Sequence, residues 1–318
     1  MKNLVNIYNK TGYVYLTSDL THESLNNLKE EINLFYINKK TDQATVSVLD
    51  LKNPDLQKKI FNIFNQDSIK DFLQDLSLKL KTKVSILPSF HIMRNYHVNR
   101  ITTDRIGWHR DCAGELNYTY CVEKLVNPRY IFGKIGIFFQ ENLYKYGGGI
   151  DVIPCSHLYI KKNIRFLRGL QNFRLFFLCF IQKKFKKFYK LFPESFWIFF
   201  LSAKRVKTTI GSPVFFDSRI QHRGSPINDE YIDTTKQLGK YNIEVPHLYT
   251  KISVYAHFGS TEGADSYIYD RIRRKEDLMK SIFLDWLKEI DLCGNYFPKM
   301  SNHMKNIINP IYNKYINS

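Results

Sequence analysis

The spacing of apolar residues changes near residue 84, and this change limits the folds that the chain can adopt. Before it, Leu25, Leu28 and Ile32 recur at the spacing of a helix with one buried face. After it, short apolar runs of strand length alternate with glycine-containing turns at 147–149 and 211–213. Helices followed by strands predict an α+β protein. Short strands between such turns are typical of a jelly-roll barrel, cupin-like in kind.

The same spacing predicts the individual elements. Helices are expected at 22–34, at 54–80 with a break near Asp67, and at 269–290. Strands are expected at 12–16, 84–88, 90–94, 130–140, 214–216 and 251–258. We therefore expect one domain over residues 1–318, with a helical N-terminal part at 10–83, a jelly-roll core at 84–260 that contains an insertion at 160–208, and a C-terminal helical extension at 265–318. The Asn-, Lys- and Ile-rich ends are interpreted as compositional bias rather than as functional segments.

The cysteines and the apolar content narrow the class of protein. Of the 318 residues, 44% are hydrophobic, which is enough for a folded core, and the five cysteines are scattered without a Cys-x-x-Cys pair. This pattern argues against a disulfide scaffold or a structural zinc site and fits a reducing compartment. The first residues lack the apolar segment of a secretion signal, and no apolar run approaches the roughly 20 residues that span a bilayer. We therefore expect a cytoplasmic protein.

His109, Asp111 and His222 form a candidate metal site. Side chains two apart in an extended segment share a face, so His109 and Asp111 can bind the same ion. A second histidine from a distant strand completes a set of two imidazoles and one carboxylate, which leaves other coordination positions open, as in non-haem Fe(II) oxygenases. Zinc hydrolases also use such ligands, but the chain lacks the His-Glu-x-x-His pattern with its general base. Iron is therefore favoured.

Four segments carry a family resemblance in addition. They are 12–25, 107–111, the turn Gly-Gly-Ile-Asp-Val-Ile-Pro-Cys-Ser-His at 148–157, and 211–224, which ends in Ile-Gln-His-Arg-Gly. In this order they resemble the phytanoyl-CoA dioxygenase-like family of Fe(II)/2-oxoglutarate-dependent oxygenases. The resemblance covers residues 10–260 apart from the insertion. It implies a double-stranded β-helix and an oxidoreductase, a 2-oxoglutarate-dependent dioxygenase that acts on a small organic molecule.

The resemblance also implies cofactors and the residues that hold them. Fe(II) is bound by His109, Asp111 and His222, and the cosubstrates are 2-oxoglutarate and dioxygen. The family holds the distal carboxylate of 2-oxoglutarate with an arginine on the strand after the distal histidine. Here Lys251 stands at that position, with Ser253 or Ser225 as hydroxyl partners. Lysine is a point charge rather than a planar fork, and Arg223 is the alternative cation, although its side chain is expected on the opposite face of its strand.

The reaction type and the pocket follow less directly. Related halogenases lack the carboxylate ligand, so the presence of Asp111 favours hydroxylation or desaturation. Arg94, Tyr96 and Trp108 are candidate substrate-pocket residues, although core packing explains Tyr96 and Trp108 equally well. Three alternatives stay open: a metal-free descendant that only binds a ligand, a zinc-binding cupin-type protein, and a scaffold whose basic insertion binds a membrane surface or polyanions.

The insertion is strongly basic and aromatic. Residues 161–207 contain thirteen Lys or Arg and one acidic residue, a net charge of +12 (13 − 1) out of +17 for the chain. Aromatic residues at 173, 177, 180, 185, 188 and 192 recur at helical spacing with lysines between them. The simplest interpretation is a lid with buried aromatic residues and solvated lysines. The alternatives are peripheral contact with a membrane surface or an anionic, lipid-like substrate. Binding to nucleic acid is not expected, because it requires exposed stacking platforms.

Overall fold

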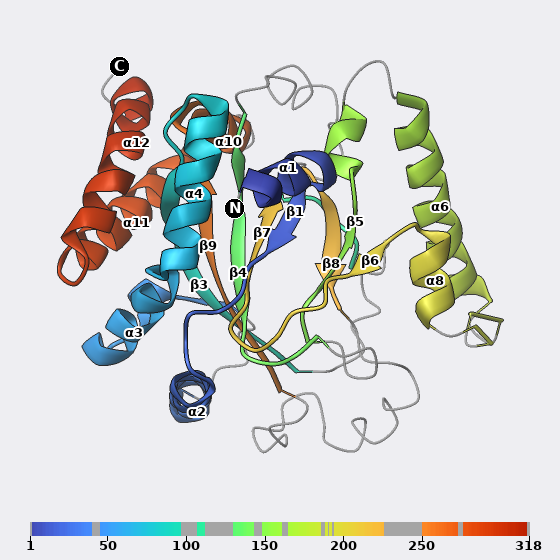
Figure 1. Ribbon diagram of the computed structural model, residues 1–318, viewed down its shortest axis with the longest axis horizontal. Helices are drawn as coiled ribbons and strands as arrows, with labels where there is room; N and C mark the ends of the chain where they lie inside the picture. Colours follow the sequence, from blue (N-terminus) through green and yellow to red (C-terminus); the bar gives the residue numbers. More distant parts are fainter. Residues whose placement is uncertain are drawn as a thin grey trace.

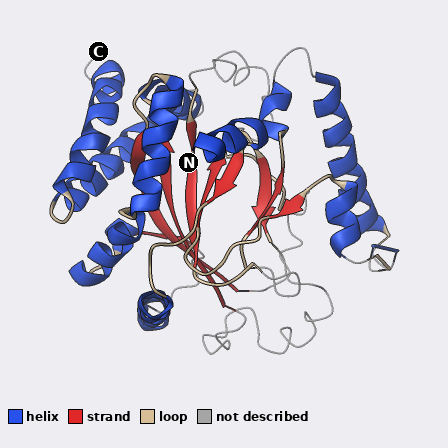
Figure 2. Cartoon of the chain, in the orientation of Figure 1, coloured by secondary structure: helices blue, strands red, loops and turns tan. Residues whose placement is uncertain are grey.

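The computed structural model describes residues 2–39, 45–96, 107–111, 130–142, 148–160, 165–185, 188–189, 191–192, 194–225, 250–272 and 276–316 (Figures 1 and 2). This part of the chain combines helices with antiparallel sheets, so the predicted α+β class is confirmed. Among the described helices, none is both long and apolar enough to cross a lipid bilayer.

Two antiparallel sheets form the centre of the molecule. The larger has the strand order β1-β7-β4-β9-β3-β2 and the smaller β6-β5-β8. The bounds in the larger sheet are β1 Tyr13–Tyr15, β7 Pro213–Asp217, β4 Phe132–Phe138, β9 Thr250–Gly259, β3 Ser85–Tyr96 and β2 Thr45–Ser47. In the smaller sheet they are β6 Lys204–Arg205, β5 Ile150–Ile153 and β8 Gln221–Gly224. An isolated bridge between His109 and His222 adds one further pairing at the edge strand β8.

The two faces of the larger sheet have different partners. In β9, Ile252, Val254, Ala256 and Phe258 belong to the main core, which the helices cover, while the residues between them face the other way. On that second face, Phe138, Val214 and Phe216 pack with Ile150 and Val152 of the smaller sheet. A small apolar core therefore lies between the sheets, beside the segment that carries the candidate metal ligands.

Helices cover the outer face of the larger sheet (Figure 1). The predicted helix at 22–34 is α2 His22–Lys39, and the predicted break near Asp67 separates α3 Pro54–Phe64 from α4 Asp67–Leu80. Asn53 caps α3 by accepting hydrogen bonds from the backbone amides of Asp55 and Leu56. The helix expected at 269–290 is divided into α10 Thr261–Ile272 and α11 Glu276–Gly294.

Both Asn-, Lys- and Ile-rich ends of the chain form helices. Helix α1 Lys2–Thr11 was not predicted, whereas α12 Pro298–Ile316 lies in the predicted C-terminal helical extension. Val5 and Tyr8 of α1 are buried in the main core, and so are Met304 and Ile308 of α12. The apolar residues among the many Asn and Lys residues therefore have a packing role.

Strand β3 replaces the two strands expected at 84–88 and 90–94. Its pairing with β9 is irregular between Leu87 and His91, where Ser89 adopts a positive φ of 84°. The carboxylate of Glu289, from α11, accepts hydrogen bonds from the backbone amides of Ser89 and Phe90. A buried side chain from a helix two hundred residues later thus satisfies the amides that the irregular pairing leaves without a strand partner.

The insertion forms a separate layer of helices, α6 Arg165–Lys184 and α8 Glu194–Phe200, next to the smaller sheet (Figure 1). Leu175, Leu178 and Ile181 of α6 pack with Trp197 of α8 and with Trp108. The predicted basic helix is confirmed, but the predicted burial of its aromatic residues is wrong. Phe173, Phe177, Phe180, Phe185 and Phe188 are all exposed.

Candidate metal centre

Backbone pairing brings the three candidate ligands together. His109 and His222 exchange two backbone hydrogen bonds of 2.9 Å, and the amide of Asp111 donates to the carbonyl of Ser218 over 3.0 Å. One ligand atom from each of His109, Asp111 and His222 lies within 4.8 Å of the others. The Nε2 atom of His109 is 3.8 Å from Oδ1 of Asp111, and that of His222 is 3.6 Å from Oδ2. A distant histidine and the His-x-Asp pair thus form one cluster.

Both imidazole rings are held by backbone carbonyls. Nδ1 of His109 lies 2.7 Å from the carbonyl oxygen of Gly107, and Nδ1 of His222 lies 3.1 Å from that of Ile220. A carbonyl only accepts, so each Nδ1 carries the proton and each Nε2 keeps a lone pair directed towards Asp111. Burial, followed by the neighbouring His109, lowers the pKa of His222 to about 3. A neutral, oriented imidazole is the form that binds a metal ion.

Asp111 has one oxygen engaged and one without a partner. Lys134 of β4 donates to Oδ1 over 3.0 Å, whereas Oδ2 is buried and accepts no hydrogen bond from the described residues. Burial alone would raise the pKa of Asp111, but the charge of the Lys134 ammonium beside it outweighs burial and holds the pKa well below its usual value. An ionised, buried oxygen without a partner is rare, and a cation between it and the two Nε2 atoms would supply one. The donor set therefore fits a divalent metal.

The sequence did not single out Lys134, and it missed two neighbours of the cluster. His91 of β3 stacks on Tyr255 of β9 with ring centroids 5.2 Å apart, and burial, followed by the charge of Lys134, lowers the pKa of His91 to about 4. One sequence feature could have identified Lys134 as a candidate site residue: it is the only charged residue in the otherwise apolar strand Phe132–Phe138. A cation in a central strand indicates a buried partner.

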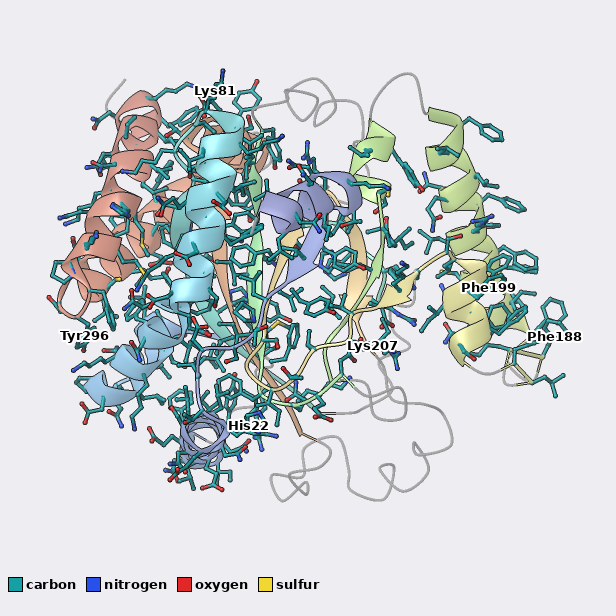
Figure 3. The ribbon with its side chains drawn as sticks, viewed as in Figure 1. His22, Lys81, Phe188, Phe199, Lys207 and Tyr296 are labelled. Carbon is teal, nitrogen blue, oxygen red and sulfur yellow. The ribbon has the colours of Figure 1, made fainter. Side chains whose placement is uncertain are left out.

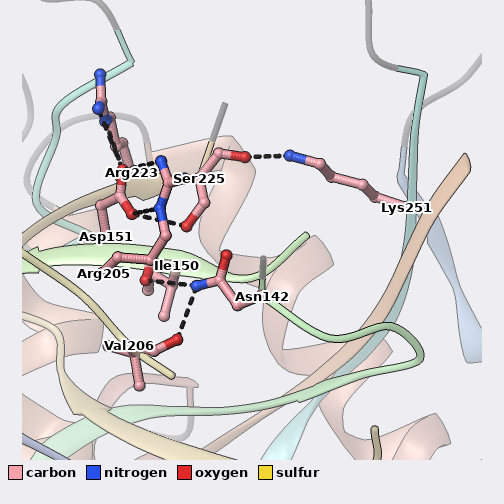
Figure 4. Close-up of polar contacts among 8 residues, drawn as sticks. All are labelled: Asn142, Ile150, Asp151, Arg205, Val206, Arg223, Ser225 and Lys251. Carbon is pink, nitrogen blue, oxygen red and sulfur yellow. Dashed lines mark hydrogen bonds and ion pairs between the residues drawn. The ribbon is translucent and has the colours of Figure 1, made fainter. Parts of the chain in front are cut away.

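The residues predicted to hold 2-oxoglutarate lie at the start of β9 and the end of β8. Lys251 donates to the backbone carbonyl of Ser225, and the Ser225 hydroxyl donates to Asp151 over 2.8 Å (Figure 4). Ser253 is buried and lies two residues further along β9, on the same face as Lys251. Burial lowers the pKa of Lys251 to about 7. The hydrogen bond places Lys251 and Ser225 in direct contact. The lowered pKa means that the ammonium of Lys251 loses part of its charge near neutral pH.

Arg223 points away from the metal cluster, as its place in the strand predicts. Its guanidinium pairs with Asp151 at 3.1 Å and lies over the ring of Trp108, 4.8 Å from the ring centroid. Arg205 binds the same carboxylate at 2.9 Å, and register-paired Asp151, Arg205 and Arg223 share one face of the smaller sheet. Burial would raise the pKa of Asp151, but Arg223 and Arg205 lower it. The side chains of these arginines therefore lie on the face of the smaller sheet that is next to α6 and α8.

The three candidate pocket residues have different positions. Arg94 is on the helix-covered face of β3, where its guanidinium lies 5.4 Å from the ring centroid of Tyr36 in α2, so it points away from the metal cluster. Trp108 is buried against α6 and α8. The backbone of Tyr96 pairs with Thr250, but its side chain lies outside the described residues.

Comparisons with known proteins found solved structures of low sequence identity and low TM-score. No protein-family model and no curated protein matches the chain, so the resemblance to the phytanoyl-CoA dioxygenase-like family stays a prediction. Similar solved structures include EvdMO1 (11% identity, TM-score 0.45), which the chain matches over 81% of its own length and 49% of that chain. They also include SnoK, a non-heme alpha ketoglutarate dependent carbocyclase from nogalamycin biosynthesis (12%, TM-score 0.46), with 82% and 84% covered. A third is EctD from S. alaskensis with 2-oxoglutarate and 5-hydroxyectoine (12%, TM-score 0.45), with 82% and 76% covered. The chain thus spans about half the length of EvdMO1, and the chemistry of its site has to follow from its own residues.

Proposed function

We propose that this chain is a single-domain Fe(II)- and 2-oxoglutarate-dependent dioxygenase that hydroxylates or desaturates a small organic molecule. The observation that carries the proposal is the cluster of His109, Asp111 and His222, with both Nε2 lone pairs and the unpartnered Oδ2 directed to one point. Two imidazoles and one carboxylate leave coordination positions open for a chelating cosubstrate and dioxygen. We further infer that the two facing sheets are the halves of a double-stranded β-helix.

Each protein group has a defined task in this proposal. Gly107 and Ile220 hold the imidazoles in one tautomer through their carbonyls, and Lys134 orients the carboxylate by binding Oδ1. Lys251 supplies the cation for the distal carboxylate of 2-oxoglutarate, with the hydroxyl of Ser253 nearby, whereas the Ser225 hydroxyl is engaged by Asp151. Iron with 2-oxoglutarate and dioxygen supplies the oxidising power when bound. The apolar core between the sheets excludes water from one side of the cluster.

The charged form of Lys251 is favoured when a carboxylate is bound beside it. Burial works against the charged ammonium of Lys251, and a carboxylate beside it favours the charged form. The contact with the Ser225 carbonyl leaves the ammonium further donors, since a lysine head carries three. A carboxylate at this end of β9 would therefore meet a cation that is already held in place.

Anaerobic titration tests the proposal. The purified protein receives Fe(II) and then 2-oxoglutarate, and visible charge-transfer absorption is recorded. We expect a band that requires both additions, disappears in His109→Ala, weakens in Lys251→Ala, and persists in the control variant His22→Ala, whose exposed histidine lies in α2.

Three other results would contradict parts of the proposal. Tightly bound iron without a band after 2-oxoglutarate points to another cosubstrate. Zinc that survives purification and resists exchange for iron supports a zinc-binding protein of the cupin type. Failure to bind any divalent metal excludes an enzyme of this kind and leaves the scaffold interpretation.

A further inference from the structure

Helix α6 has an apolar stripe on its solvent side. Phe166, Leu170, Phe173, Phe177 and Phe180 follow one another at four, three, four and three residues, so they share one face of the helix. All five are exposed; Phe166 reaches 79% and Phe173 62%. The neighbouring Phe176 is 69% exposed. A continuous aromatic stripe in water is unusual, since isolated exposed apolar residues are the normal case.

The core of the protein does not need this stripe. The opposite face of α6 is already buried: Leu175 and Leu178 pack with Trp108 and the α8 residues. In the helical projection the buried and exposed apolar residues lie on opposite sides of the axis. Helix α6 is therefore apolar on two faces. One is buried, while the other contacts α8 through Phe177 and Phe200, whose ring centroids lie 5.8 Å apart, and is otherwise largely exposed.

The exposed stripe continues beyond α6. Phe185, Phe188, Leu191, Phe196 and Phe199 are also exposed, with Phe199 at 82%. In Figure 3, Phe188 and Phe199 extend away from the body of the molecule, on the side opposite to the helices α11 and α12. We call the exposed apolar residues between 166 and 199 the aromatic face of the insertion.

The charge of the same segment identifies its partner. Residues 161–207 carry a net charge of +12, and Lys183 and Lys184 at the end of α6 are exposed beside the stripe. Aromatic and leucine side chains together with many lysines are typical of helices that lie at an anionic membrane surface. A second copy of the chain would bring two such charges together, and like charges at an interface disfavour association.

We propose that the aromatic face of the insertion docks on the surface of a bilayer that contains anionic lipids. The phenylalanines enter the boundary between headgroups and acyl chains, and the lysines bind the lipid phosphates and carboxylates. The contact is peripheral, since no described helix is long and apolar enough to cross the bilayer. The proposal is independent of the metal chemistry, because it uses none of the residues of the metal centre.

Cosedimentation with vesicles tests it. The full-length protein is mixed with vesicles of phosphatidylcholine alone and of phosphatidylcholine with phosphatidylserine. We expect binding to the anionic vesicles that weakens with added salt. A variant with Phe173→Ser, Phe176→Ser and Phe199→Ser should lose affinity by about a thousandfold, at roughly tenfold for each inserted phenylalanine. Lys183→Gln with Lys184→Gln should lose about twentyfold, at about fivefold for each lysine.

Two control variants accompany the vesicle-binding test. Leu78→Ser with Leu284→Ser removes two exposed leucines from α4 and α11 and should bind as the wild type does. His109→Ala should also bind normally, so failure of the metal proposal and failure of this one remain distinguishable. Far-ultraviolet circular dichroism checks that the phenylalanine variant keeps its helices.

Three outcomes would overturn the proposal. They are equal binding by the phenylalanine variant, equal binding to vesicles without phosphatidylserine, and a protein that ignores vesicles but forms a dimer that the same variant dissociates. The last would assign the aromatic face to a second copy of the chain.

Discussion

Lys134 is placed to stabilise the metal site while it is empty, and its replacement by methionine tests that role. Its ammonium lies 3.0 Å from Oδ1 of Asp111. Coulomb's law at an effective dielectric constant of about 20 gives roughly 5.5 kcal/mol for two charges at this separation. Removal of one partner from a buried ion pair destabilises by about 3–5 kcal/mol. Since Lys134 keeps 20% of its side-chain exposure, the lower value applies, and we expect a loss of about 3 kcal/mol in metal-free protein.

Asp111→Asn is the matched variant, because it breaks the same pair from the other side. Without metal, both variants leave one charge without its partner and should unfold at similar temperatures, about 6 °C below the wild type, at roughly 2 °C for each kcal/mol in a chain of this size. With metal, the two should diverge. A divalent ion gives Asp111 a new partner in Lys134→Met, whereas Asp111→Asn has no carboxylate to bind the ion.

Thermal unfolding with a chelator and with excess Mn²⁺ measures both effects. A ligand that binds only the folded state raises its stability with concentration, by about 2.7 kcal/mol at a hundred times the dissociation constant. We expect the Mn²⁺-induced increase to be larger in Lys134→Met than in the wild type, and absent in Asp111→Asn. The reasoning is refuted if Lys134→Met without metal unfolds at the wild-type temperature, or if Mn²⁺ stabilises it less than it stabilises the wild type.

Three further predictions concern the clamp, a buried acid and a close packing contact. The pKa of Lys251 is lowered to about 7, so the affinity for 2-oxoglutarate should fall about tenfold for each pH unit above 7, because binding then requires uptake of a proton. Lys251→Arg should remove this pH dependence. Calorimetry at several pH values measures the affinity of both proteins. Burial raises the pKa of Glu289 from 4.5 to about 7, so between these pH values the folded state binds more protons than the unfolded state. The free energy of unfolding should therefore fall by up to about 3 kcal/mol as the pH rises from 4.5 through 7. Urea unfolding of Glu289→Gln should lack this loss. A Cβ at Gly263 would lie 1.9 Å from the carbonyl oxygen of Ile131, so Gly263→Ala should destabilise the protein by about 3 kcal/mol. A Cβ at Gly169 would have no atom within 4 Å, so Gly169→Ala should be neutral or stabilising by about 0.5–1 kcal/mol. An equal loss of stability in the two variants would contradict the packing argument.

The pair of His109 and Asp111 was accessible from the sequence because it depends on a rule of short range, whereas His222 joins the metal cluster from a distant strand. Two residues apart on an extended segment share a face, so His109 and Asp111 could be paired without knowledge of the fold. The break near Asp67 was equally local, since α3 ends at Phe64 and α4 begins at Asp67. The prediction that Arg223 points away from the cluster used the same alternation.

Other features depend on contacts that sequence spacing does not contain. Lys134 meets Asp111 only because two separate segments converge on the same face of the sheet. The position of Arg94 on the helix-covered face depends on the register of β3 with β9. In α6 the spacing revealed the aromatic stripe but not the second stripe that contains Leu175 and Leu178, and a helix with two such stripes gives no indication of which one the protein buries. That choice was made by Trp108 and α8.

The place of β9 in the larger sheet has a consequence for how the chain folds. Strand β9 lies between β4 and β3, so without it the sheet consists of two unconnected pieces, β1-β7-β4 and β3-β2. During synthesis the residues of both pieces emerge from the ribosome before residues 250–259, and β4 and β3, if formed by then, each present an unpaired edge. Unpaired edges are templates for aggregation, and pairing across such long sequence separations is slow. Ribosome-bound chains that end before residue 250 should therefore depend on chaperones, and release of the final strand should be the step that closes the sheet.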